Sequence, residues 1–217
     1  MSDIRLFAAE RASVARTSEG NLIAVRGTRD GAVFTADWYE AHALEGRVFG
    51  ANMGSVTTPL TFLITLANRP DAWIRVPDNT MILPLSVHVV LEAATGPATE
   101  TDVRIAQNDI GNGTSSAATV GPVSMRTDAP VTSNCVARQL ATGDTTAETN
   151  PMSVWRQTVI TASAAGNDAV SQQHITRADM GYPVLVGPAT IEVFVAATTT
   201  QATGFVIITW VEFPERS

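Results

Sequence analysis

The chain offers few side chains that could carry out chemistry. Its 217 residues include three histidines and one cysteine. His42, His88 and His174 lie far apart in the sequence, and none belongs to the His-x-His pair expected of a metal site in a β-barrel. We interpret each as a solvated or hydrogen-bonded structural histidine. Nothing beside Cys135 would lower the pKa of its thiol, so we expect this cysteine to be a small buried hydrophobe.

Other catalytic signatures are missing as well. The sequence has no Gly-x-Ser-x-Gly elbow, no Gly-x-Gly-x-x-Gly opening a helix and no lysine for a phosphate-binding loop. Asn108, Asp109 and Asn112 could give oxygen ligands to a hard cation, but one carboxylate without EF-hand spacing favours an Asx-rich turn. Paired carboxylates for glycoside cleavage stay open, because such partners can be distant in sequence. We therefore expect no enzymatic activity, with no catalytic, cofactor-binding or metal-binding residues.

Composition narrows the class of protein further. Hydrophobic residues make up 45% of the chain, charged residues 16%, and the net charge is -7. This apolar content excludes a mainly disordered chain, and a pI near 4.9 argues against non-specific binding of nucleic acid. The N-terminal residues lack the apolar run of a signal peptide, and no window of 18 apolar residues predicts a membrane span. We expect synthesis in a cytoplasm without a cleaved export signal.

Apolar residues recur with a period of two, which predicts an all-β fold. The clearest case is residues 81–92, where Leu83, Leu85, Val87, Val89 and Leu91 are expected to point to one side. Further strands are expected at residues 22–26, 57–67, 72–76, 101–106, 131–140, 154–162, 190–197 and 204–213. Residues 75–80 are expected to form a type I turn that reverses one strand into the next. Residues 198–204 are expected to close a hairpin, with Gly204 at positive φ.

One segment, residues 35–45, is typical of a short helix that begins at Thr35 and ends before Gly46. The predicted organisation is an N-terminal arm with one short helix at residues 1–50, followed by an antiparallel, jelly-roll-like β-sandwich at residues 51–217.

The C-terminal strands have apolar residues on both faces. Along residues 205–213 the second row contains Val206, Ile208 and Trp210, and Phe194 belongs to the second row of the neighbouring strand. A half-buried strand needs one apolar row, so these four side chains are expected to be covered by the arm or by another subunit. We interpret them as a candidate subunit interface.

Three segments together resemble the jelly-roll virion proteins of tailed bacteriophages. They are residues 73–85 (WIRVPDNTMILPL), 187–195 (GPATIEVFV) and 208–214 (ITWVEFP). Residues 45–59 have a similar sequence character. The resemblance implies a non-enzymatic structural protein of the virion, assembled in the host cytoplasm. A capsid decoration, cement or minor capsid protein is expected, which forms a symmetric homo-oligomer such as a trimer and stabilises the shell.

The implied partners are other copies of the chain and the major capsid protein, without direct contact to nucleic acid or membrane. Arg5, Arg11 and Arg16 of the arm are candidate contacts to a neighbour, because guanidinium groups pair with carboxylates through two bonds.

The alternative is a receptor- or glycan-binding head module of a tail fibre or spike. The four tryptophans all lie in predicted helix or strand segments rather than loops, which argues against glycan stacking. A β-sandwich lyase or hydrolase is a third hypothesis.

Overall fold

A computed structural model describes residues 38–55, 57–63, 69–93, 98–108, 118–140, 148–159, 171–197 and 201–214. The chain divides into two compact units, Met1–Glu45 and Gly46–Ser217, close to the boundary predicted at residue 50. The strand expected at residues 22–26 and the arm residues Arg5, Arg11 and Arg16 lie outside the described residues.

The described part of the first unit is the helix α1, Trp38–Leu44. Glu40 lies in its first turn, where its negative charge complements the helix dipole, and His42 lies in its last turn. Trp38 and His42 are four residues apart and their rings meet edge to face, with centroids 4.8 Å apart. The helix ends where Gly46 adopts a φ of 72°. A helix in this segment was expected, although Thr35 lies outside the described residues.

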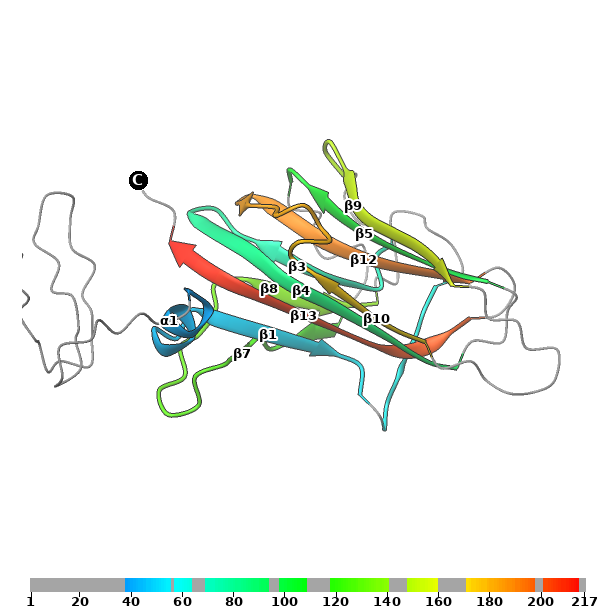
Figure 1. The fold of residues 1–217 in the computed structure, drawn as a ribbon, viewed down its shortest axis with the longest axis horizontal. Helices are drawn as coiled ribbons and strands as arrows, with labels where there is room; N and C mark the ends of the chain where they lie inside the picture. Colours follow the sequence, from blue (N-terminus) through cyan, green and yellow to red (C-terminus); the bar gives the residue numbers. More distant parts are fainter. Residues whose placement is uncertain are drawn as a thin grey trace, which may run out of the picture. The chain divides into compact units, whose positions relative to one another are not determined.

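The second unit consists of two antiparallel sheets that pack as a sandwich, which confirms the predicted fold class (Figure 1). The first sheet has the order β10-β4-β13-β1-β7, with β11 also pairing with β4 and β2 with β13. The second has the order β6-β8-β3-β12-β5-β9. The strands of the first sheet are β1 (Val48–Met53), β2 (Leu60–Thr61), β4 (Thr80–Ala93), β7 (Val123–Ser124), β10 (Ser171–Thr176), β11 (Leu185–Val186) and β13 (Thr203–Pro214). Those of the second are β3 (Ala72–Val76), β5 (Thr99–Ala106), β6 (Ala118–Val120), β8 (Val136–Gln139), β9 (Met152–Val159) and β12 (Ala189–Ala197).

The hydrophobic core lies between the sheets and uses alternate residues of the long strands. Ile191 and Val193 of β12 are fully buried, as are Val87 and Val89 of β4. Each large aliphatic side chain buried in this way contributes about 1.5–3 kcal/mol relative to exposure. Alternation thus leaves one face of each sheet for other side chains, and the functional candidates are on these outer faces or at the sandwich edges.

The structure corrects the predicted subunit interface. Val206, Ile208 and Trp210 are 0% exposed and belong to the core between the sheets, so they have no surface left for another subunit. Phe194 is also buried, and the Arg104 guanidinium lies 4.4 Å from its ring centroid. Because β13 is apolar on both sides, its sequence could not show which row faces inward.

The alternation along β4 changes phase once. From Val87 to Leu91 the odd-numbered residues are buried, as predicted, but nearer the start of the strand Ile82 is buried and Leu83 and Leu85 are partly exposed. The cause is a register shift against β13, where Thr209 opposes Ser86 and Trp210 opposes Pro84. A bulge of this kind adds one residue to a strand and moves the following side chains to the other face.

Two predicted reversals turn out to be crossovers. β3 and β4 belong to different sheets, and so do β12 and β13, so neither connection is a hairpin. Asn79 takes a φ of 61° in the first connection. Gly204 does not have the positive φ expected of it; a Cβ at this position would instead collide with the carbonyl oxygen of Val90 on β4.

Candidate functional site

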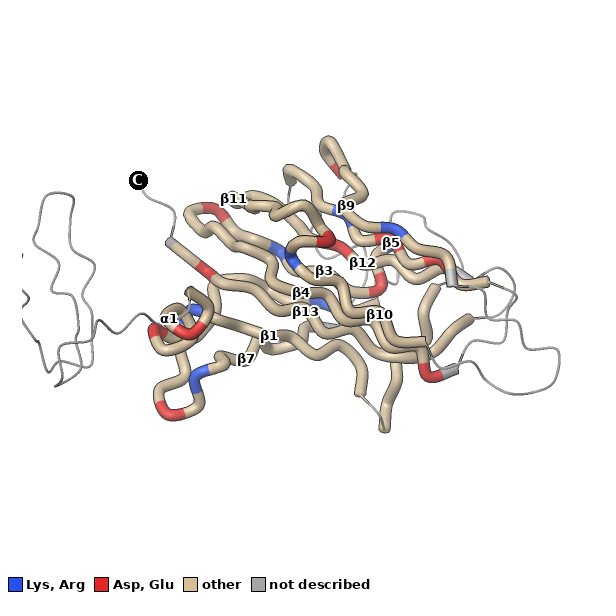
Figure 2. Tube along the Cα trace, viewed as in Figure 1, with Lys and Arg blue, Asp and Glu red and all other residues tan. Residues whose placement is uncertain are grey.

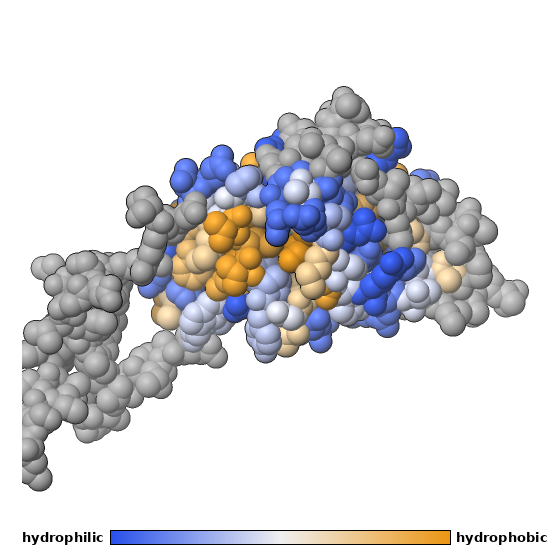
Figure 3. Space-filling model, turned by 90° about the horizontal axis from the view of Figure 1, so that it is seen from above, coloured by the Kyte–Doolittle hydropathy of each residue, from blue (hydrophilic) through white to orange (hydrophobic). Residues whose placement is uncertain are grey.

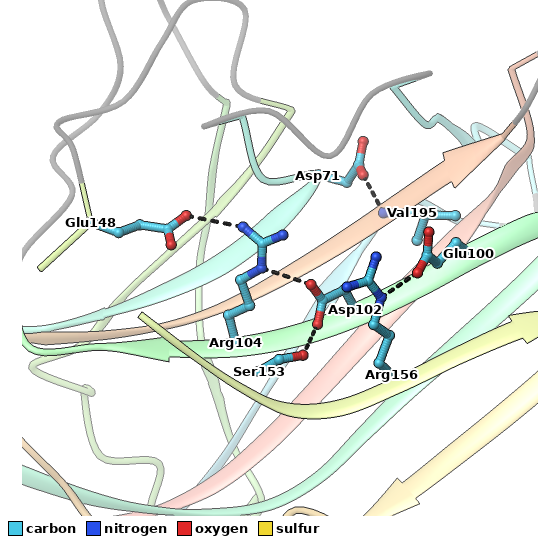
Figure 4. A network of polar contacts seen from close by, with 8 residues as sticks. All are labelled: Asp71, Glu100, Asp102, Arg104, Glu148, Ser153, Arg156 and Val195. Atoms are coloured by element: carbon cyan, nitrogen blue, oxygen red, sulfur yellow. Dashed lines mark hydrogen bonds and ion pairs between the residues drawn. The ribbon is translucent and has the colours of Figure 1, made fainter. Parts of the chain in front are cut away.

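A polar network covers part of the outer face of the second sheet (Figure 4). Val103 of β5 points into the core, so its neighbours Asp102 and Arg104 point outward. The register places Glu192 of β12 directly opposite Arg104. We use the name polar network for Glu100, Asp102, Arg104, Glu148, Ser153, Arg156 and Glu192.

Arg104 links two carboxylates of the network. Its Nε donates to Asp102 Oδ2 at 2.7 Å, and its Nη1 lies 3.5 Å from Glu148 Oε1. The other Asp102 oxygen accepts a hydrogen bond from the Ser153 hydroxyl on β9. Asp102 is 1% exposed, so this carboxylate is held by a charge-assisted bond in a site with little solvent.

Glu192 is the least satisfied member of the network. It is 0% exposed, and neither carboxylate oxygen makes a hydrogen bond within the described residues. Burial first, and then the neighbouring Glu148 carboxyl, raise the pKa of Glu192 well above its ordinary value, while Arg104 acts in the opposite direction. Glu192 is therefore protonated at neutral pH, which leaves Asp102 and Glu148 to share Arg104. Among the residues that the structure describes, no group of three or more His, Cys, Asp or Glu has the arrangement of a metal site.

Asp71 is a further buried carboxyl, which lies just before β3. Its two oxygens accept hydrogen bonds from the backbone N–H groups of Leu63 at 2.9 Å and Val195 at 2.7 Å. Burial raises the pKa of Asp71 to about 7, although these two bonds favour the charged form. The carboxyl ties the segment after β2 to β12, which is a structural role.

A cleft of about 650 Å³ opens between the edge strands of the two sheets, β9 and β10. We call it the edge cleft. Its lining residues are Trp155, Gln157, Thr158, Ser171, Gln172, Gln173, His174 and Asp179. All but Trp155 are polar.

Beside this cleft, two histidines face each other across β4 and β10. His88 opposes His174 in the register, and their ring centroids are 5.4 Å apart. A ring nitrogen of His88 is 2.7 Å from the Gln172 amide nitrogen, where the amide donates if the imidazole nitrogen is unprotonated. Burial and the charge of His174 lower the pKa of His88 below its ordinary value. At neutral pH His88 is therefore the hydrogen-bond acceptor in this pair.

A third feature is a hollow of about 470 Å³, and none of its described lining residues is charged. We call it the apolar hollow; its lining residues are Ile105, Ala106, Gln107, Asn150, Met152, Val184, Leu185, Val186, Pro188 and Ala189. Met152, Val184 and Val186 are 60%, 52% and 46% exposed. A hydrophobic area is visible in the view of Figure 3, and β11 itself carries no charged residue in Figure 2.

The structure locates two of the features that the sequence singled out, Cys135 and Asn108. Cys135 is buried as predicted, and burial together with the nearby Glu212 carboxylate raises the pKa of its thiol. Asn108 accepts a hydrogen bond from the backbone N–H of Thr149, while Asp109 and Asn112 lie outside the described residues.

Sequence reasoning missed the buried carboxyls Asp71, Asp102 and Glu192. A signal existed for Glu192, because a single acidic residue in the apolar run 191–195 must lie on the outer face of its strand. Nothing in the sequence indicated that this outer face is itself buried.

Within the described residues, no helix is both long and apolar enough to cross a membrane. Comparison with known proteins gives the chain no relative: no family model, no curated protein and no solved structure matches it.

Proposed function

We propose that this chain is a non-enzymatic structural protein of a virion, of the decoration, cement or minor capsid type. In this role it forms a symmetric homo-oligomer and contacts the major capsid protein. The observation that supports the proposal best is the apolar hollow, a largely apolar and uncharged surface on a sandwich whose core is already complete. The centre of a protein interface is depleted in charge in the same way.

The strand order supports the jelly-roll form of the sandwich. Along the chain β3, β4 and β5 alternate between the second and the first sheet, and so do β9, β10, β12 and β13. Counted from the edge strands β10 and β9, the two sheets contain the sets β10-β4-β13-β1 and β9-β5-β12-β3, with four strands each. Two four-stranded sheets wound in this way are the arrangement of a jelly roll.

The free energy gained by covering the exposed apolar side chains favours an assembly of several subunits over a strong isolated pair. Met152, Tyr182, Val184 and Val186 are each about half exposed. Covering such a side chain yields about 1 kcal/mol. Together they supply about 4 kcal/mol per subunit, which is no more than the roughly 4–15 kcal/mol that association itself costs. Contacts of this strength hold subunits when they are repeated around a symmetry axis and supplemented by a capsid surface.

Sedimentation of the purified chain over a range of concentrations tests the oligomer. We expect mass to increase with concentration, and Val184→Asp to abolish the increase because it places a charge in the apolar hollow. Val123→Asp is the matched control, since Val123 is 66% exposed on β7 and does not line the hollow. A monomer at every concentration, or equal behaviour of the two variants, would contradict this interface.

The shell role has its own test. Particles produced with this gene present should contain the chain in the shell at a fixed copy number, visible by electron microscopy and mass spectrometry of purified virions. If purified particles lack the chain, the proposed function is wrong.

A further inference from the structure

We propose that the edge cleft between β9 and β10 is a carbohydrate-binding site. This goes beyond a shell role, because that role needs contacts to other proteins and no small-molecule site. The volume of about 650 Å³ falls within the range of about 300–1,000 Å³ that is typical of small-molecule sites.

The inward-facing rows of both edge strands contribute side chains to the cleft. On β9, Trp155 pairs with the core residue Val103 and Gln157 pairs with Thr101, so both side chains point into the gap between the sheets. On β10, Gln173 and Ile175 are the buried positions. Ile175 joins the core, whereas Gln173 lines the cleft. The sandwich is therefore open and polar along this edge.

Several polar groups at this edge are buried without a protein partner. Gln173 is 6% exposed, and neither its Oε1 nor its Nε2 makes a hydrogen bond in the part of the chain that the structure describes. The same holds for the hydroxyl groups of Thr99 and Thr101, which are on the neighbouring strand β5 and are 0% exposed. An unsatisfied buried polar group costs about 1–3 kcal/mol. A buried amide without partners beside a cleft needs an explanation, and a ligand in the cleft that supplies the missing bonds provides one.

The lining chemistry selects the class of ligand. Gln157 and Gln173 each present one acceptor and two donors, Gln172 presents its acceptor and the donor that is not bonded to His88, and Thr158 and Ser171 present hydroxyl groups. Hydroxyl-rich ligands satisfy such a mixed set because every sugar hydroxyl both donates and accepts. Trp155 adds an aromatic ring against which the apolar C–H face of a sugar can pack.

Other ligand classes fit less well. The described lining residues include no arginine or lysine, so a phosphate or a nucleic acid would find no permanent positive charge among them. Asp179 is the one carboxylate among the lining residues that the structure describes. Its Oδ2 accepts hydrogen bonds from the backbone N–H and the hydroxyl of Thr176. Its Oδ1 makes none within the described residues and can accept a bond from a sugar hydroxyl.

The test uses the full chain and a panel of neutral oligosaccharides composed of glucose, galactose, mannose and N-acetylglucosamine. Saturation-transfer NMR identifies members that bind, and tryptophan fluorescence titration gives the dissociation constants. We expect at least one member to bind. Gln157→Ala should weaken that binding at least tenfold, since it removes hydrogen bonds to the ligand. Arg156→Ala is the matched control, because Arg156 is next in the same strand but pairs with Glu100 on the opposite face; it should bind like the native chain.

Gln173→Leu separates a binding site from a poorly packed edge. Leucine has a similar volume and needs no hydrogen bonds, so the variant should have a higher unfolding temperature and should lose sugar binding. Failure of the whole panel to bind would overturn the proposal. So would unchanged affinity in both the Gln157 and the Gln173 variants. Sedimentation is unaffected by either result, so failure of this proposal is distinguishable from failure of the shell role.

Discussion

Glu192 should make the stability of the sandwich fall as pH rises through the neutral range. Its folded-state pKa is raised from an ordinary value of 4.5, because the carboxyl is fully buried beside Glu148. A carboxyl with a raised pKa stays protonated in the folded state when the unfolded chain has already released the proton. Its stabilising contribution is therefore complete below pH 4.5 and is lost progressively as pH rises towards the folded pKa.

The size of the effect follows from the unfolded pKa alone, as long as the folded pKa stays above the assay pH. Each pH unit changes the free energy of unfolding by about 1.4 kcal/mol. Between 4.5 and 7 the loss therefore reaches about 3 kcal/mol. Glu192→Gln keeps the shape of the protonated side chain and needs no proton. We expect the variant to match the native chain near pH 4.5 and to exceed its stability by up to about 3 kcal/mol at pH 7.

Urea unfolding from pH 4.5 to pH 7.5 measures this difference. The difference between the native chain and Glu192→Gln isolates Glu192, since the contribution of Asp71 is present in both proteins. Glu100→Gln is the matched control, because Glu100 pairs with the half-exposed Arg156 in the same network. It should change stability by at most about 1 kcal/mol. The reasoning is refuted if the difference between native chain and Glu192→Gln does not grow with pH, or if the variant is the less stable protein at pH 7.

Two further predictions concern the backbone. Asp71→Ala, measured at pH 5, should lower the free energy of unfolding by at least about 1–3 kcal/mol, because the buried N–H groups that Asp71 binds lose their acceptor; the exposed turn variant Asp78→Ala should stay close to the native value, and equal losses would contradict the role of Asp71. Gly204→Ala should lower stability by about 1–3 kcal/mol in thermal unfolding, because its methyl group would collide with the Val90 carbonyl. Gly121→Ala, where a Cβ meets no atom within 4 Å, should be nearly neutral, and similar shifts in both variants would refute the collision.

Hydrophobic alternation was sufficient to predict the sandwich and many of its strands. It failed at two kinds of position. Along β4 the bulge reversed the side of Leu83 and Leu85, because a register shift depends on the partner strand and leaves no mark in the alternation itself. For Thr57 to Ala67 a strand was expected, but the described part contains only β2, Leu60–Thr61.

Local sequence patterns also could not show which of the two sheets each strand joins. A short polar segment between two strands suits a hairpin and a crossover equally well, since turn residues specify backbone dihedral angles and not the sheet that the next strand joins. The crossovers at residues 77–79 and after β12 are therefore visible only in the structure. The same holds for the winding of the strands that supports a jelly roll.

The residues of the edge cleft could not be predicted from local sequence patterns either. Trp155 is predicted to lie in a strand rather than a loop, and this argues against sugar binding only on the assumption that strand tryptophans are covered. The assumption fails at an edge strand, where an inward-facing side chain can line the opening between two sheets. Similarly, the burial of Gln173 without hydrogen-bond partners is visible only once β9 and β10 are placed opposite each other. Polar residues at inward positions of the two edge strands of a sandwich are thus a feature that a sequence can reveal only after the edge strands are known.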